Sequence, residues 1–376
     1  MALTRDGVET VARRDVQQRR PSIRSGIAWG VGGSAVALAV ILVAHAFRRG
    51  AVAARIRNPA VHGAPRPVHP LGLGGNGNIT ALQIGTVVAL AALATVFTVG
   101  WRRNPRSPVL LMAFACTALV WLDPVMNWAP YAVYNPQLWH FPETWAWVSL
   151  SPTVEPFIVI GYVMFYLGPY FPAMYLLRRI QRSRPPTSFV WRHPLIVLAA
   201  LIVPIGFVFD GLLETFLVRQ GLYIYAQTIR FGSVFAGHTY QFPLIWESTF
   251  VTLVMVPAGV LLYRDDTGRT VAERLGQRLR FGARRPALTS FLVMFAVLNV
   301  AYLCYGGAFA AIRASGAATS VACPWPYPEA KVYDPQGDYQ AAGQAGPFFS
   351  GIMSGWPTGQ SGRPAVTSPL GGGRCS

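Results

Sequence analysis

Five acidic side chains lie within or beside long apolar stretches of this sequence: Asp123, Glu155, Asp210, Glu214 and Glu247. A charged group in bilayer hydrocarbon costs about 2.5–3.5 kcal/mol on insertion scales, so such residues are rare in membrane helices unless they have a function. The order of the apolar stretches places all five acids on the same side of a membrane. The pattern therefore predicts a membrane-embedded site for acid–base chemistry.

Asp210 and Glu214 are the candidates for a proton donor. They are four residues apart in one apolar stretch, so a helix places both on one face. Two carboxyl groups this close in a low dielectric do not both ionise, and the one that keeps its proton can act as a general acid. The alternative is structural: Glu214 lies at the water interface and Asp210 pairs with Arg219 or Arg230.

Glu247 and Asp123 are the candidates for the partner carboxylate. Glu247 follows Pro243 in the first turn of a predicted helix, where the helix macrodipole favours a negative charge. That position suits either a structural acid or a catalytic carboxylate. Asp123 precedes a proline, as many turn-forming aspartates do, but its polar and aromatic neighbours are predicted to line a pocket: Trp121, Asn127 and Trp128.

The remaining candidate substrate-binding residues are polar side chains predicted at the same end of the bundle: His140, Glu155, His238, Asn299 and Tyr302. Each has a structural alternative. Glu155 can be a helix-start residue and the two histidines solvated loop residues. Asn299, Tyr302 and Tyr305 form a stripe that is typical of interhelical hydrogen bonding.

Composition predicts an all-α integral membrane protein. Of 376 residues, 52% are hydrophobic and 12% charged, against about 25% charged in soluble domains. Stretches of around 20 apolar residues suffice to cross a hydrocarbon core of about 30 Å. We therefore predict a bundle of about seven transmembrane helices: 26–47, 79–100, 107–122, 157–177, 194–216, 243–263 and 287–312. The predicted organisation is a cytoplasmic tail over 1–25, the bundle over 26–313 and an extracytoplasmic Gly/Pro-rich tail over 314–376.

The net charge of +17 reflects arginines that flank the apolar stretches, so it does not predict a nucleic-acid partner. With the N-terminus in the cytoplasm, 21 of the 32 basic residues lie on the cytoplasmic side, in line with the positive-inside tendency. This predicts a multi-pass protein of the inner (plasma) membrane with a cytoplasmic N-terminus. The arginines between 48 and 66 argue for the opposite placement of the first helix.

One loop predicts a further structural feature, and the residue types that the apolar stretches lack exclude several classes of function. Segment 121–147 contains five of the eleven tryptophans and four prolines, which predicts an irregular aromatic-rich extracytoplasmic cap over the bundle. The only lysine, Lys331, lies in the tail, so a retinal Schiff base is not expected. The apolar stretches also lack the several histidines of haem or di-iron sites and the clustered aspartates of Mg²⁺-dependent prenyl chemistry. We expect no cofactor and no metal, which leaves proton chemistry or proton-linked transport.

Three segments give a family resemblance: WLDPVMNW (121–128), FPETWAWVSLSPTVEPF (141–157) and KVYDPQG (331–337). They resemble the AveC-like spirocyclase family of bacterial membrane proteins, over roughly residues 80–340. The resemblance implies closure of a dihydroxy-ketone into a spiroketal, or a related dehydration, on a polyketide- or terpenoid-like lipidic substrate among membrane lipids.

Such a reaction needs a general acid, for which Asp210 or Glu214 is suited, and a carboxylate, for which Glu247 or Asp123 is suited. The alternative function is a proton-coupled carrier or lipid-handling protein that uses the same acids.

Overall fold

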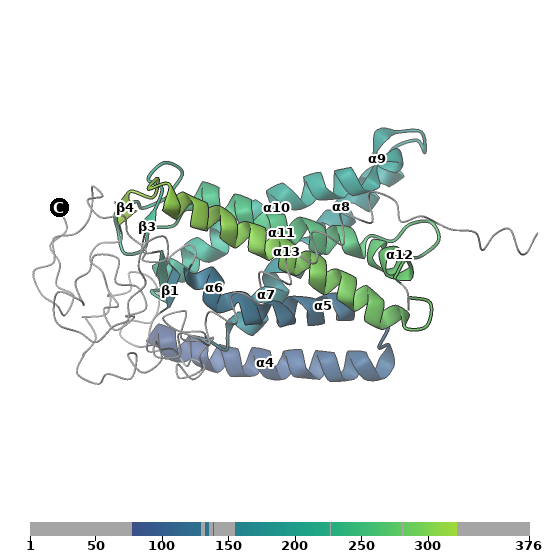
Figure 1. Cartoon of the computed structure of the whole chain (residues 1–376), viewed down its shortest axis with the longest axis horizontal. Coiled ribbons are helices and arrows are strands. Elements are labelled where there is room, and N and C mark those ends of the chain that lie inside the picture. Colours follow the sequence, from purple (N-terminus) through teal and green to yellow (C-terminus); the bar gives the residue numbers. More distant parts are fainter. Residues whose placement is uncertain are drawn as a thin grey trace, which may run out of the picture.

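The computed structural model describes residues 77–128, 132–134, 138, 155–225, 227–279 and 282–321. In this part of the chain, long helices run side by side, with short strands gathered at one end and the short helices α9 and α12 at the other (Figure 1). The first predicted span (26–47), the tail 1–25, nearly all of the tail 314–376 and most of the predicted cap lie outside the described residues.

Most of the described chain is helical. A 3₁₀ turn, η1 (Leu119–Leu122), joins α5 to α6. The α-helices are α4 (Gly77–Arg103), α5 (Pro108–Ala118), α6 (Asp123–Trp128), α7 (Ile158–Leu167), α8 (Tyr170–Arg182), α9 (Phe189–Arg192), α10 (Pro194–Arg219), α11 (Leu244–Leu262), α12 (Val271–Gln277) and α13 (Pro286–Ala314).

Five described stretches are long and apolar enough to cross a membrane: Thr80–Arg103, Ile158–Arg182, Pro194–Arg219, Leu244–Leu262 and Pro286–Ile312. Each coincides with a predicted span, and the shorter helix Pro108–Leu122 coincides with the predicted span 107–122. The prediction of a mainly helical chain with several stretches long enough to cross a membrane is therefore confirmed. The total of seven spans stays a prediction, as does the cap.

The prediction of an all-helical chain missed two small antiparallel sheets. In the first, β1 (Ala132–Tyr134) pairs with β2 (Tyr223–Tyr225); in the second, β3 (Gln227–Thr228) pairs with β4 (Ser320–Val321). The partners are far apart in the sequence, and two or three residues show no alternating pattern. Gln241 joins the sheets, because its side-chain amide donates to the carbonyls of Tyr225 (2.9 Å) and Ser320 (3.2 Å).

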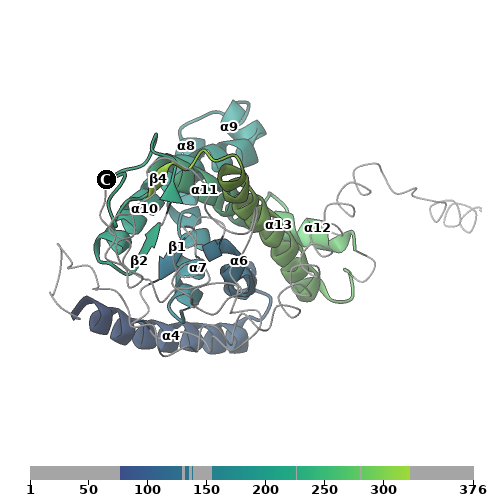
Figure 2. The same cartoon turned by 60° about the vertical axis from the view of Figure 1, so that its left-hand side comes forward.

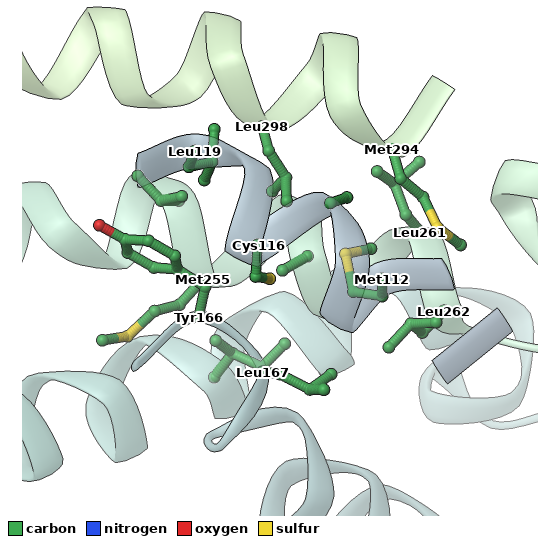
Figure 3. Packing of buried hydrophobic residues seen from close by; sticks show 14 of the residues in the cluster. Met112, Cys116, Leu119, Tyr166, Leu167, Met255, Leu261, Leu262, Met294 and Leu298 are labelled. Atoms are coloured by element: carbon green, nitrogen blue, oxygen red, sulfur yellow. The ribbon is translucent and has the colours of Figure 1, made fainter. Parts of the chain in front are cut away.

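The helices pack around one apolar core, part of which is shown in Figure 3. Met112 and Cys116 from α5 and Leu119 from η1 meet Met255 from α11 and Leu298 from α13, and all five are essentially inaccessible. Helices α10 and α11 approach closely because glycines face the neighbouring helix, as is common in membrane bundles. In contrast, α4 lies at the outer edge of the bundle in both views (Figures 1 and 2).

The apolar stretch Ile158–Arg182 is broken near its middle. Helix α7 ends before Gly168, and α8 begins after Pro169, whose ring nitrogen has no hydrogen to donate to a continuous helix. As a result the two halves have different neighbours: α7 packs mainly against α5 and α11, whereas α8 packs mainly against α10. Only the α7 half reaches the end of the bundle where the strands lie.

Candidate functional site

A partly open cavity of about 90 Å³ lies at the strand end of the bundle, between α6, β1, α7, α10, β2, α11 and α13. Three carboxyl groups line it, from Asp123, Glu214 and Glu247, together with the amide of Asn127. The hydroxyl-bearing side chains in its wall are all tyrosines: Tyr134, Tyr162, Tyr166, Tyr223, Tyr225, Tyr302 and Tyr305.

Asp123 is the centre of a first hydrogen-bonded group. It begins α6 directly after the apolar helix Pro108–Leu122, and its side chain is 2% exposed. Its Oδ1 accepts from the Tyr162 hydroxyl (2.6 Å) and its Oδ2 from Asn127 Nδ2 (2.7 Å). Tyr162 also hydrogen-bonds to the hydroxyl of Tyr302. Burial raises the pKa of Asp123 to about 7, although the two hydrogen bonds favour the carboxylate and lower it.

Glu214 and Glu247 form a second group. The hydroxyls of Tyr223 and Tyr225 both donate to Glu214 Oε2, the latter over 3.2 Å. The Tyr305 hydroxyl donates to Glu247 Oε1 over 2.6 Å. The rings of Tyr302 and Tyr305 stack with centroids 5.6 Å apart, so α13 contributes one tyrosine to each group. The two groups are thus neighbours in the wall of the same cavity.

Asp210 is fully buried but does not line the cavity. It approaches the Ser248 hydroxyl on α11, and neither carboxyl oxygen makes a hydrogen bond of standard geometry within the described part of the chain. It interacts electrostatically with both Glu214 and Glu247. The second group is therefore a cluster of three neighbouring carboxyl groups.

Asp123, Asp210, Glu214 and Glu247 have no arginine within 4 Å among the described residues. There, the single ion pair within 4 Å joins Arg274 to Asp265 at the opposite end of the bundle. Arg219 lies near the cavity end, but its guanidinium stacks on the rings of Tyr240 (4.2 Å) and Phe235 (5.4 Å). The predicted alternative, in which Asp210 pairs with Arg219 or Arg230, is therefore not found among them.

Three cavity tyrosines, Tyr134, Tyr223 and Tyr225, lie on the strands, outside the membrane-spanning helices. Burial and nearby carboxylates raise the pKa of both Tyr134 and Tyr225 well above the ordinary value. Their hydroxyls therefore keep their protons at neutral pH and act as hydrogen-bond donors. The wall of the cavity combines such donors with carboxyl acceptors, which suits a neutral oxygenated ligand or a cation.

A sequence model of a protein family, described as Spirocyclase AveC-like, matches residues 101–333. This range covers more than half of the chain and contains every residue that lines the cavity. The chain belongs to the AveC-like spirocyclase family. No curated protein and no solved structure gives a significant match.

In this AveC-like chain the cavity brings together five of the residues predicted from sequence: Asp123, Asn127, Glu214, Glu247 and Tyr302. These come from four elements, α6, α10, α11 and α13, so three of the predicted acids meet at one end of the bundle. Their roles in chemistry stay predictions.

Other predicted residues lie elsewhere. The Trp121 indole donates to Asn299 over 2.9 Å, and this contact joins η1 to α13. Neither residue lines the cavity. Glu155 is buried at the start of α7 but is not in the cavity wall. His238 stacks on Tyr240 and is also outside the wall. His140 and the side chain of Trp128 lie outside the described residues.

Sequence reasoning missed most of the tyrosines. Two spacings held the signal: Tyr162 and Tyr166 are four apart in an apolar helix, and Tyr223 and Tyr225 alternate around Ile224. Hydroxyl groups that recur on one face of an apolar element indicate a polar surface within the bundle. Tyr305 was recognised only as part of a stripe typical of packing.

Proposed function

We propose that this chain is a membrane-embedded acid–base cyclase or dehydratase, similar to a spiroketal cyclase, that acts on a polyketide- or terpenoid-like lipidic substrate. The observation that carries the proposal is the pair of carboxyl-centred groups in one tyrosine-lined cavity. Membership of the AveC-like spirocyclase family supports a cyclase-type role. In this proposal every proton transfer is carried out by side chains of the chain itself.

The proposed proton donor is Glu214. Three carboxyl groups this close cannot all hold a negative charge in a low dielectric, because among the described residues no positively charged group lies within 4 Å of them. At least one of the three therefore keeps its proton. Of the acids in this cluster, Glu214 lines the cavity and Asp210 does not. Glu214 would protonate the hydroxyl of a cyclic hemiketal. The C–O bond then breaks, water leaves and an oxocarbenium ion remains.

The proposed acceptor is Asp123. Hydrogen bonds from Tyr162 and Asn127 favour its carboxylate form and fix its orientation. The carboxylate would take the proton from the second substrate hydroxyl as its oxygen attacks the oxocarbenium carbon, which closes the second ring. The net change is the loss of one water. An inverting glycosidase also divides acid and base roles between two carboxyl groups around such an ion. General acid or base catalysis of this kind typically raises the rate by about 10²–10⁴-fold.

The tyrosine rings would stabilise the cationic intermediate through their π-faces. Seven rings in the wall also leave little room for bulk water, since the cavity measures about 90 Å³, and water occupies about 30 Å³ per molecule in the liquid. With few waters beside a bound substrate, capture of the oxocarbenium ion by water would be limited.

The packing below the cavity favours an enzyme over a carrier. A carrier needs access to its site from both sides of the membrane. Here Cys116, Leu119 and Met255, all at most 1% exposed, fill the space between the helices (Figure 3). The arginine-rich end that carries α9 and α12 is therefore separated from the cavity by a close-packed core. The positive-inside tendency supports a cytoplasmic position for that end in the inner membrane.

The proposal is tested by the lipids of a deletion strain and by complementation. We expect an intermediate heavier than the product by one water, or an isomer of the product, to accumulate, as detected by mass spectrometry of lipid extracts. The wild-type gene should restore the profile, whereas Glu214→Gln and Asp123→Asn should not. Asp266→Asn is the matched control, because this acid is exposed on the loop after α11. An unchanged lipid profile with altered uptake would overturn the cyclase in favour of the carrier.

A further inference from the structure

The cavity is too small to contain a whole lipidic molecule. Pockets for drug-sized ligands measure about 300–1,000 Å³, whereas this one measures about 90 Å³. It has room for the reacting rings only. The rest of such a substrate must extend through an opening, and the position of that opening decides from which medium the substrate arrives.

Two ends of the cavity are covered. At the strand end, Ala132 and Tyr134 from β1 and Tyr223 and Tyr225 from β2 form part of the wall, so the first sheet lies across it. At the other end lies the close-packed core of α5, α11 and α13. The remaining candidate for an opening is the side of the bundle.

The space between α7 and α10, beside the break at Gly168 and Pro169, is the candidate for this opening. Helix α8 packs along α10, but α7 makes no comparable close backbone approach to α10. Near the break the space is bridged by the edge-on rings of Phe165 and Phe209, with centroids 5.7 Å apart. Farther along, Gly161 from α7 and Leu217 from α10 both line the cavity. The cavity therefore reaches the space between these two helices.

Burial along α10 agrees with such an opening. Asp210 and Val218, one helical turn before and after Glu214 on the same side of α10, are both buried. Glu214 lies on the same face but is partly exposed. The face of α10 that points away from the bundle is apolar: Leu212 is 72% and Phe216 54% exposed. The outward surface of α10, on the side opposite to Glu214, is thus suited to acyl chains.

From these observations we infer that the substrate is a bilayer-dissolved molecule that enters sideways between α7 and α10, with its apolar part lying in this opening. The inference rests on the proposed function for the identity of the substrate, but not for the existence of the opening. A larger side chain at Gly161 would fill this route. The position can accept one, because an added Cβ would meet no atom within 4 Å.

The test is photolabelling of the full chain in phosphatidylcholine–phosphatidylglycerol vesicles with a bilayer-dissolved aryl diazirine, followed by peptide mass spectrometry. We expect label on Phe165, Phe209 and Glu214 in addition to the outward-facing Leu212. In Gly161→Leu, label on Glu214 should fall to the level of buried Asp210, while label on Leu212 is unchanged. Gly85→Leu is the control, because this glycine on α4 is exposed and equally uncrowded.

Two results would overturn the lateral route. One is a Glu214 that reacts with a water-soluble carbodiimide and amine but not with the diazirine, which would indicate entry from the aqueous side. The other is label on residues 26–47 in place of Phe165 and Phe209, which would mean that this segment covers the opening. Labelling does not depend on turnover, so these results are distinguishable from a failure of the cyclase proposal, which the lipid profile reports.

Discussion

Replacing Tyr162 with phenylalanine removes one of the two hydrogen bonds that hold the Asp123 carboxylate. Hydrogen bonds to charged groups contribute about 1.5–3 kcal/mol, and one pKa unit corresponds to about 1.36 kcal/mol. The pKa of Asp123 is about 7 in the wild type. In Tyr162→Phe it should therefore rise by about 1–2 units.

This shift has a direct consequence for catalysis if Asp123 is the proton acceptor. At pH 7 about half of the wild-type carboxyl is ionised, whereas a pKa of about 8–9 leaves about 1–10% ionised. Activity at pH 7 should therefore fall by about 5- to 50-fold. It should recover as the pH is raised above the new pKa, because the carboxylate is restored.

The shift can be measured without knowledge of the substrate. Infrared difference spectra in lipid nanodiscs report the carbonyl stretch of protonated carboxyl groups, and the band lost in Asp123→Asn identifies this residue. Its titration midpoint should lie near 7 in the wild type and higher in Tyr162→Phe. Tyr175→Phe is the control, because Tyr175 is 63% exposed. A midpoint that does not move in Tyr162→Phe would refute the reasoning.

Three further predictions concern stability and the cavity. Because the pKa of Asp123 is raised from 3.8 to about 7, the folded chain binds more protons than the unfolded one across that window, and the free energy of unfolding should decrease as pH rises through it. Thermal unfolding in detergent should show a weaker pH dependence in Asp123→Asn, and an equal dependence would contradict the burial argument. Gly259→Ala should lower the free energy of unfolding by about 1–3 kcal/mol, because the added methyl meets the buried Ile202 side chain, which has no room to move. The control is Gly85→Ala on α4, where the methyl meets no atom and should not destabilise the fold. Gly161→Leu should abolish turnover while keeping the wild-type melting temperature, whereas a lipid profile restored by this variant would show that the cavity is not the site.

Much of the architecture was predictable because it depends on local sequence. Apolar stretches of sufficient length predicted the long helices, although 157–177 was predicted as one helix and the structure breaks it at Gly168 and Pro169. The order of the stretches also placed Asp123, Glu214 and Glu247 at one end of the bundle. These features follow from helical geometry and from the cost of charge in hydrocarbon, which act along a single segment.

The composition of the site depended on tertiary structure. Sequence spacing put Asp210 and Glu214 on one face of a helix, but only the packing of α10 against α11 buried Asp210 and left Glu214 in the cavity wall. The hydrogen bonds from Tyr162 to Asp123 and from Tyr305 to Glu247 join residues far apart in the sequence. A side-chain hydrogen bond forms only when two elements meet within about 3 Å, and helical periodicity carries no information on which elements meet. The sequence by itself therefore determined that acids gather at one end of a membrane bundle, and the tertiary structure decided which of them share a cavity and which tyrosines hold them.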